Sequence, residues 1–167
     1  MTLLLALDLI VVASTLLYAG AIGALGAIVA PVVFRSGISS AADLMTTIFG
    51  RFDRVAGALA LVALLAEFAA LMRRRSETTG SKQSRLNHVR SALVAVFSLT
   101  VAIQAAVLSP GIAALHREGV QRGVGPRGAT FDRMHRASSS VGKLAVLSAL
   151  AIAALALKNR SRDPGVS

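Results

Sequence analysis

Four long apolar stretches, each bracketed by charged residues, constrain the fold of this chain more than any other feature of its sequence. They cover residues 9–34, 55–72, 91–108 and 137–157. Each is close to the ~20 residues that a helix rising ~1.5 Å per residue needs to cross ~30 Å of hydrocarbon. Lipid offers no hydrogen-bond partners to the backbone, so a helix, which satisfies its own amides, is the expected state. The sequence therefore predicts an all-α integral membrane four-helix bundle, folded as a single membrane domain over residues 1–167.

Composition agrees with this prediction. Hydrophobic residues make up 54% of the chain, charged residues 16% and aromatic residues only 4%, so the apolar content consists mainly of Ala, Leu, Val, Ile and Gly. Small aliphatic side chains let helices approach closely within lipid. The chain has no cysteine, which excludes disulfides, thiolate catalysis and cysteine-ligated metals.

The segments between and around the spans have distinct characters. Apolar residues recur at helical spacing from Ile38 to Phe52, which predicts a short amphipathic helix between spans one and two. This helix either lies in the membrane interface or runs straight into span two. Within span one, Ala19, Gly23 and Ala27 form a stripe of small residues suited to close packing, within the bundle or against a second copy. Pro31 is expected to bend that helix near its end. We further predict a mobile basic loop, a Gly/Arg-rich loop and a polar C-terminal tail, at residues 73–90, 116–136 and 158–167.

The net charge of +10 raises the possibility of nucleic-acid binding. The basic residues, however, fall between or just outside the apolar stretches, and no aromatic residues alternate with them to stack on bases. We therefore expect the partner to be a lipid bilayer with anionic headgroups, and no nucleic acid. The residues predicted to contact headgroups are Arg73, Arg74, Arg75, Lys158 and Arg160.

The basic residues are divided equally between the two sides of the membrane and therefore give little indication of the orientation of the spans. Each side of the membrane receives nine of the 18 basic residues. The Arg73–Arg75 triplet and the basic residues after span four lie directly against span ends, where charge counts most. This favours both termini in the cytoplasm.

Two acidic residues are candidates for function because ionisable groups within a membrane are costly. Asp8 lies at the edge of span one, and Glu67 lies near the end of span two. Because the two spans run antiparallel, both residues fall toward the same side of the membrane. Together they could bind a cation or share a proton. Alternatively, Asp8 is interfacial and Glu67 pairs with Arg73, Arg74 or Arg90.

Spans three and four supply the other polar candidates. Gln104 shares a helix face with Thr100, and such residues usually form hydrogen bonds between helices. Span four opens with His135, Ser138 and Lys143, on the side opposite Asp8 and Glu67. His135 could carry a proton or ligate a metal or haem, although a single histidine is a weak metal motif, and no cofactor is predicted. No catalytic motif is present, so an enzyme is not expected.

Several short motifs are similar to one family of bacterial membrane proteins. The run from Gly26 to Arg35 resembles the end of that family's first span, and Phe49-Gly50-Arg51-Phe52 resembles its entry to span two. Leu108-Ser109-Pro110-Gly111-Ile112 looks like its proline exit from span three. Phe131-x-x-Met134-His135-x-x-Ser138 resembles its Phe-x-x-Leu-His-x-x-Ser opening of span four. The chain departs from the family at Gly142, where an Asn is usual.

This family carries domain of unknown function 4149 and is similar to eukaryotic transmembrane protein 205. The resemblance implies four spans and a multi-pass protein of the bacterial cytoplasmic membrane. It leaves activity open. The eukaryotic relative is associated with resistance to platinum drugs, and copper-resistance and haem-pathway membrane proteins are distantly similar.

Three hypotheses follow for function. The first is transport or homeostasis of a small solute or metal. The second is a non-catalytic accessory subunit that packs against a larger membrane protein complex, or a homo-oligomer. The third is a membrane redox protein of the haem or copper type, which depends on His135 alone.

Overall fold

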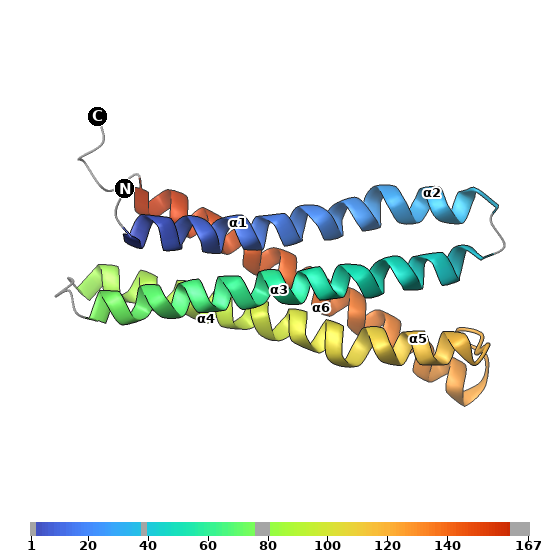
Figure 1. Cartoon of the computed structure of the whole chain (residues 1–167). Coiled ribbons are helices and arrows are strands. Elements are labelled where there is room, and N and C mark those ends of the chain that lie inside the picture. The colour runs from blue at the N-terminus through green and yellow to red at the C-terminus, as the bar shows by residue number, and fades with distance from the viewer. Residues whose placement is uncertain (1–2, 38–39, 76–80, 161–167) are drawn as a thin grey trace.

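The computed structural model describes residues 3–37, 40–75 and 81–160, with the side chains of residues 75, 81–84, 159 and 160 left undescribed. Its helices form four long rods that lie side by side (Figure 1), and the start of the first rod and the end of the last lie at the same end of the bundle. The elements in chain order are α1 (Leu3–Ala24), η1 (Leu25–Val29), α2 (Ala30–Arg35), α3 (Ala41–Arg75), α4 (Ser81–Ile103), η2 (Gln104–Leu108), α5 (Ser109–Arg117) and α6 (Gly125–Arg160). The first rod consists of α1, η1 and α2, and the third of α4, η2 and α5.

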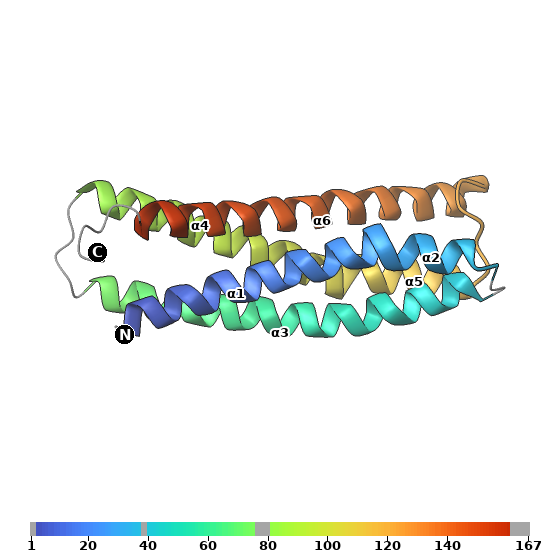
Figure 2. The same cartoon turned by 90° about the horizontal axis from the view of Figure 1, so that it is seen from above.

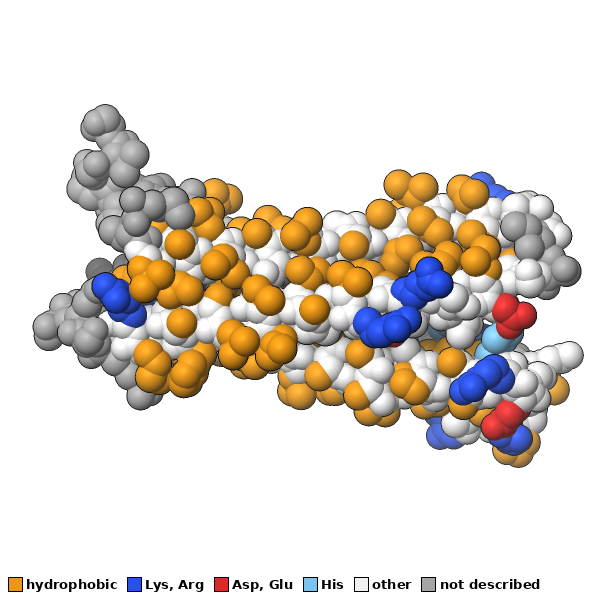
Figure 3. Space-filling model, viewed as in Figure 1, with side chains coloured by type: hydrophobic (Ala, Val, Ile, Leu, Met, Phe, Trp, Pro, Cys, Tyr) orange, Lys and Arg blue, Asp and Glu red, His pale blue; other side chains and the backbone are white. Residues whose placement is uncertain are grey.

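The four rods have the length and composition of membrane spans. Their apolar parts lie within Leu3–Arg35, Ala41–Arg74, Arg85–Arg117 and Gly125–Lys158. Leucines on every rod point outward, and Leu17, Leu99 and Leu147 are each more than 60% exposed. Hydrophobic side chains cover much of the face in Figure 3, and charged side chains gather toward the end formed by α2, α5 and the first turns of α6. An outer surface of this kind matches lipid. The fold class predicted from the sequence, an all-α four-helix membrane bundle, is confirmed, and the protein is a multi-pass integral membrane protein.

The helices are longer than the apolar stretches that predict them. The amphipathic segment before span two continues straight into it, so that α3 is one helix of 35 residues. At ~1.5 Å per residue such a helix is roughly 50 Å long and extends well beyond the hydrocarbon core. Span three likewise continues past Pro110 to Arg117.

The two loops predicted to follow spans two and three are shorter than expected. Residues 81–90 are the first turns of α4, and residues 125–136 are the first turns of α6. The predicted loop at residues 116–136 is therefore reduced to a connection over 118–124. That connection turns sharply where Gly119 and Gly123 adopt positive φ angles of 70° and 80°, which glycine tolerates best. The remainder of the predicted basic loop, residues 76–80, and the tail beyond residue 160 lie outside the described residues.

Rods one and three are each interrupted by one turn of π-helix just before a proline. Pro31 and Pro110 have no N–H group, so the carbonyl four residues earlier loses its usual partner. In η1 the Ala30 N–H bonds to the Leu25 carbonyl, and in η2 the Ser109 N–H bonds to the Gln104 carbonyl. Both interruptions fall in the second half of their rods, and therefore on the same side of the membrane. They redirect both rods there.

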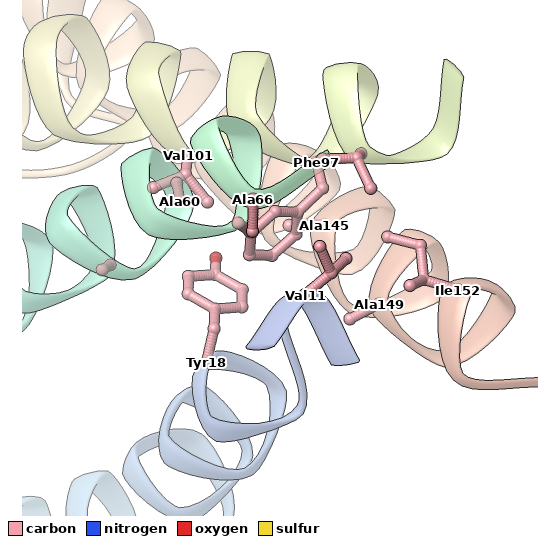
Figure 4. Close-up of a cluster of buried hydrophobic side chains, with 12 residues drawn as sticks. Val11, Tyr18, Ala60, Ala66, Phe97, Val101, Ala145, Ala149 and Ile152 are labelled. Atoms are coloured by element: carbon pink, nitrogen blue, oxygen red, sulfur yellow. The ribbon is translucent and has the colours of Figure 1, made fainter. Parts of the chain in front are cut away.

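The core lies in the other half and in the middle of the bundle. Figure 4 shows its side chains converging from all four rods: Val11 and Tyr18 from α1, Ala60 and Ala66 from α3, Phe97 and Val101 from α4, and Ala145, Ala149 and Ile152 from α6. The ring of Tyr18 meets that of Phe97 edge to face, with centroids 5.1 Å apart. Alanines dominate the contact surfaces of α3 and α6, which lets the helices approach closely.

Each rod packs against two neighbours in the ring order α1, α3, α4, α6. Figure 2 shows α6 running along the length of the bundle, while α1 runs at an angle to α3. Toward the proline end, α2 packs against α3, and α5 packs against α3 and α6. The bundle is therefore closed at the end where α1 begins and looser at the end where α2 and α5 lie.

Candidate functional site

The closed end contains a buried ion-pair cluster centred on Arg90, whose side chain is only 1% exposed. Its Nη1 donates to Asp8 Oδ1 at 2.7 Å, and its Nη2 donates to Glu67 Oε2 at 2.6 Å. Arg74 donates to Asp8 Oδ1 at 2.7 Å and lies 3.7 Å from Glu67 Oε1. Ser91 completes the set by donating its hydroxyl to Glu67 Oε1 at 2.7 Å. We refer to Asp8, Glu67, Arg74 and Arg90 as the arginine cluster.

This cluster joins α1, α3 and α4 with two negative and two positive charges. The sequence left two alternatives for the acidic residues, a shared cation or proton site and pairing with arginines. The structure brings Asp8 and Glu67 together, as the antiparallel geometry predicts, and pairs both with arginines. A buried, charge-balanced cluster of this kind holds helices in register.

The residues predicted to contact headgroups divide into three groups. Arg74 is 14% exposed and turned into the cluster. Arg73 and Lys158 are exposed at the same end of the bundle. The side chains of Arg75 and Arg160 lie outside the described residues. Their contacts with lipid stay predictions.

The looser end contains a cavity of about 1120 Å³. Its walls are mostly apolar, and polar side chains project into it from three rods. The second rod contributes Asp53 of α3, and the third contributes Gln104, Ser109 and His116 of η2 and α5. The fourth rod, α6, contributes His135, Ser138, Ser139 and Lys143. The first rod contributes Tyr18, Ile22, Gly23 and Phe34. The cavity therefore lies between the second half of α1 and the η2–α5 part of rod three, with α3 and α6 forming its other walls.

Gln104 links the two helices that flank the cavity. Its Nε2 donates to Ser109 Oγ at 3.0 Å and to Ser138 Oγ at 2.9 Å. Its Oε1 is buried and has no hydrogen-bond partner among the described residues. The sequence prediction that Gln104 bonds between helices is thus met by its amide nitrogen, which donates to Ser138 of α6. Thr100, which shares its helix face, bonds to the Phe97 carbonyl within its own helix at 2.7 Å.

Asp53 is the residue that sequence reasoning missed. Its side chain is buried, with 7% exposure, and it lines the cavity beside Ser109. Its Oδ2 has no hydrogen-bond partner within the described part of the chain, and none of the ion pairs found there includes it. The signal that could have found it is the helical spacing of Phe49 and Phe52, because a helix continuing into span two places Asp53 on the same inward face.

The polar opening of α6 is spread along the cavity wall. His135 stacks on Phe131 with ring centroids 5.8 Å apart, and Ser138 receives the bond from Gln104. Lys143 is exposed at the edge of the cavity. Among the residues that the structure describes, no three His, Asp or Glu side chains converge as metal ligands. A metal role for His135 therefore stays a prediction.

A histidine near the mouth of the cavity ties two helices together. His116, in the last turn of α5, places its Nε2 2.9 Å from Asp43 Oδ1, in the first turn of α3. Further out, Asp132 receives bonds from Arg122 at 2.6 Å and Arg136 at 2.9 Å, and Arg127 pairs with Glu118. These exposed pairs lie at the ends of helices, where headgroups and water are the surroundings.

The fold and the cavity define a class: a four-helix integral membrane protein that is closed by ion pairs at one end and hollow at the other. The chain belongs to the family of Domain of unknown function (DUF4149), whose family model matches residues 12–121. The resemblance stated from the sequence motifs is thereby confirmed. Comparison with curated proteins and with solved structures gives no match. The likeness to transmembrane protein 205 stays a prediction.

The matched residues run from position 12 in α1 through the second and third rods to position 121 in the connection that follows. They include Tyr18, Asp53, Gln104 and Ser109, and they exclude α6 with His135 and Ser138. Three of the four walls of the cavity therefore lie within the part of the chain that defines the family.

Proposed function

We propose that this protein binds a small amphipathic solute within the membrane and serves in the transport or homeostasis of that solute. One observation carries the proposal: a cavity of about 1120 Å³ with apolar walls and two buried oxygen atoms, on Asp53 and Gln104, that lack partners within the described residues. Pockets for small molecules have volumes of ~300–1000 Å³ and combine apolar walls with a few placed polar groups. Buried polar atoms are normally satisfied, so an exception in a cavity is a reason to expect a ligand.

The asymmetry of the bundle supports transport over simple storage. The arginine cluster seals one end, with Arg90 1% exposed, and the cavity occupies the other end. Transporters that alternate between two states present their site to one side while packed helices close the other. On this proposal the structure corresponds to one such state.

A steric block tests the proposal. Gly142 lines the cavity, and a Cβ added there meets nothing within 4 Å, so Gly142→Phe should fold while its ring fills part of the cavity. The matched control is Leu144→Phe, because Leu144 is 47% exposed on the outer face and is not part of the cavity wall.

Both variants and the wild type are incorporated into lipid nanodiscs and titrated with N-phenyl-1-naphthylamine, a neutral dye that brightens in apolar surroundings. We expect saturable binding above that of empty nanodiscs for the wild type and Leu144→Phe, and loss of it in Gly142→Phe. Equal signals from all three proteins would contradict binding in the cavity. Transport is then measured as cellular accumulation of labelled amphipathic compounds, where Gly142→Phe should match cells that lack the protein.

The two rival hypotheses have a direct test. Purification in mild detergent with a stoichiometric second protein would favour the accessory-subunit hypothesis. A visible absorption band would favour a haem or copper protein. Glu67 lies outside the cavity and His135 lies in its wall, so Glu67→Gln and His135→Ala, taken through the same accumulation assay, separate a role of the closed end from a role of the cavity.

A further inference from the structure

We infer that the ligand of this cavity is an amphipathic amine, a molecule with an ammonium or amidinium head that donates hydrogen bonds and an apolar body. This inference rests on the proposed function and specifies its ligand. It follows from three properties of the cavity: the kind of hydrogen-bonding atom left unmatched, the sign of the buried charge, and the aromatic content of the walls.

The unmatched atoms are both acceptors. Asp53 Oδ2 and Gln104 Oε1 are buried and lack partners within the described residues. The amide nitrogen of Gln104 donates to Ser109 and Ser138, so in this orientation the oxygen is the atom of the amide left without a partner. A ligand that donates hydrogen bonds relieves the cost of both acceptors, whereas a ligand that only accepts relieves neither.

An ionised Asp53 gives the wall of the cavity a negative charge. Asp53 is 7% exposed, and the ion pairs found in the described part of the chain leave it out. At the other end of the bundle, by contrast, Asp8 and Glu67 are balanced by two arginines. A carboxylate in such surroundings is costly without a counter-charge, and an ammonium head provides one.

Two basic residues, Arg54 and Lys143, line the same cavity and could oppose the binding of a cationic ligand. Arg54 is exposed and its Nε donates to the Gly50 carbonyl of its own helix at 3.4 Å. Lys143 is exposed as well. Long basic side chains at a membrane boundary extend toward headgroups and water, where their charge is screened. Asp53, whose side chain is 7% exposed, lies in less screened surroundings and therefore has the larger effect on a ligand inside.

Aromatic rings are concentrated around the cavity. The chain has six Phe and one Tyr, and five of these seven line it: Tyr18, Phe34, Phe49, Phe52 and Phe131. Tyr18 and Phe52 are in contact, with ring centroids 5.6 Å apart. Ring faces attract cations, most strongly where water is excluded, and they also pack against an apolar body. Both parts of an amphipathic amine are thereby accommodated.

A matched series of decyl compounds tests the inference on the wild-type protein. Decylamine is a cation with N–H donors, decyltrimethylammonium is a cation without them, decanol is neutral, and decanoate is an anion. Each displaces N-phenyl-1-naphthylamine from nanodiscs below its micellar concentration, with empty nanodiscs as the blank. We expect decylamine to bind most tightly, followed by decyltrimethylammonium and decanol, with decanoate weakest. Equal affinity for decylamine and decanol, or a preference for decanoate, would overturn the inference.

The variant that isolates the carboxylate is Asp53→Asn, which keeps the shape of the side chain. We expect its affinity for decylamine to fall by about tenfold or more while its affinity for decanol is unchanged, as for the loss of a charged hydrogen-bond partner. An unchanged affinity for decylamine would refute the role of Asp53.

The experiments distinguish failure of the proposed function from failure of the proposed ligand class. If Gly142→Phe binds every compound as the wild type does, the cavity is not the site and the proposed function fails. If Gly142→Phe weakens all four compounds but the wild type shows no preference for the amine, the cavity is the site and only the ligand class is wrong.

Discussion

Replacing Arg90 by methionine is the perturbation that bears most directly on the closed end of the bundle. The substitution keeps a long apolar side chain but removes both charged bonds, at 2.7 Å to Asp8 and 2.6 Å to Glu67. Glu67, which is 2% exposed, then retains a charge with one partner fewer. Removal of one member of a buried pair costs about 3–5 kcal/mol.

The surroundings of Glu67 place the expected cost at the lower end of that range. Arg74 is 3.7 Å from its Oε1 and Ser91 donates to the same oxygen at 2.7 Å, so part of the charge stays compensated. We expect Arg90→Met to lower the free energy of unfolding by about 3 kcal/mol. The double variant Arg90→Met with Glu67→Met leaves Asp8 paired with Arg74 and should recover most of this loss, because an apolar pair of similar volume often replaces a buried ion pair without cost.

The chain carries its own probe for the measurement. It has one Tyr and no Trp, and Tyr18 is 2% exposed at the centre of the core, so its fluorescence reports unfolding in mixed micelles of dodecyl maltoside and sodium dodecyl sulfate. The control is Arg122→Met, which breaks a 2.6 Å pair with Asp132 at the surface, where Arg122 is 51% exposed. We expect no measurable loss there, since exposed pairs contribute little. A loss below about 1 kcal/mol for Arg90→Met, or a double variant less stable than the single one, would refute the structural role assigned to the cluster.

Two further predictions concern the loose end and the orientation. A Cβ at Gly128 would meet backbone atoms, the Gln121 carbonyl oxygen among them, whereas one at Gly111 would meet only the flexible end of Met134. Gly128→Ala should therefore lower the free energy of unfolding in the tyrosine assay by about 1–3 kcal/mol, and Gly111→Ala by less than about 1 kcal/mol. Equal losses in the two variants would contradict this expectation. With both termini in the cytoplasm, a cell-impermeant thiol reagent should label Ser36→Cys and not Ser81→Cys in intact cells, and the reverse pattern would invert the orientation.

The number of crossings could be predicted from the sequence because it depends on a property summed over ~20 residues. The depth of Asp8 and Glu67 in the membrane could also be predicted. In two antiparallel helices, a residue near the start of the first lies at a similar depth to a residue near the end of the second. The partners of Asp8 and Glu67 could not be predicted. Whether Glu67 faces Arg90 or a second carboxylate depends on the rotation of α3 and α4 about their axes, which tertiary packing decides.

Helix ends and the cavity were harder to predict. The charges of Arg51 and Arg54 mark the boundary of hydrocarbon, and the sequence prediction took that boundary as the start of span two. The backbone does not stop there, because an exposed arginine can reach headgroups while the helix continues. Asp53 lies between these two arginines, outside the apolar stretch at residues 55–72. The continuous α3 buries Asp53 at 7% exposure while Arg51 and Arg54 are exposed.

The two prolines connect the separate features of the molecule. Pro31 and Pro110 each remove one backbone donor, and rods one and three each respond with a turn of π-helix. Because both rods run in the same direction across the membrane, the two distortions fall on one side and spread the bundle there. At the undistorted end, helices that pack closely through alanine bring carboxylates and arginines within bonding distance. At the distorted end the spacing is larger, and Asp53 and Gln104 keep oxygens that no described side chain reaches. π-helical turns are often found at functional sites, and here η2 supplies Gln104 to the cavity wall. Replacement of Pro110 by alanine should therefore reduce dye binding in the cavity more than it changes the free energy of unfolding.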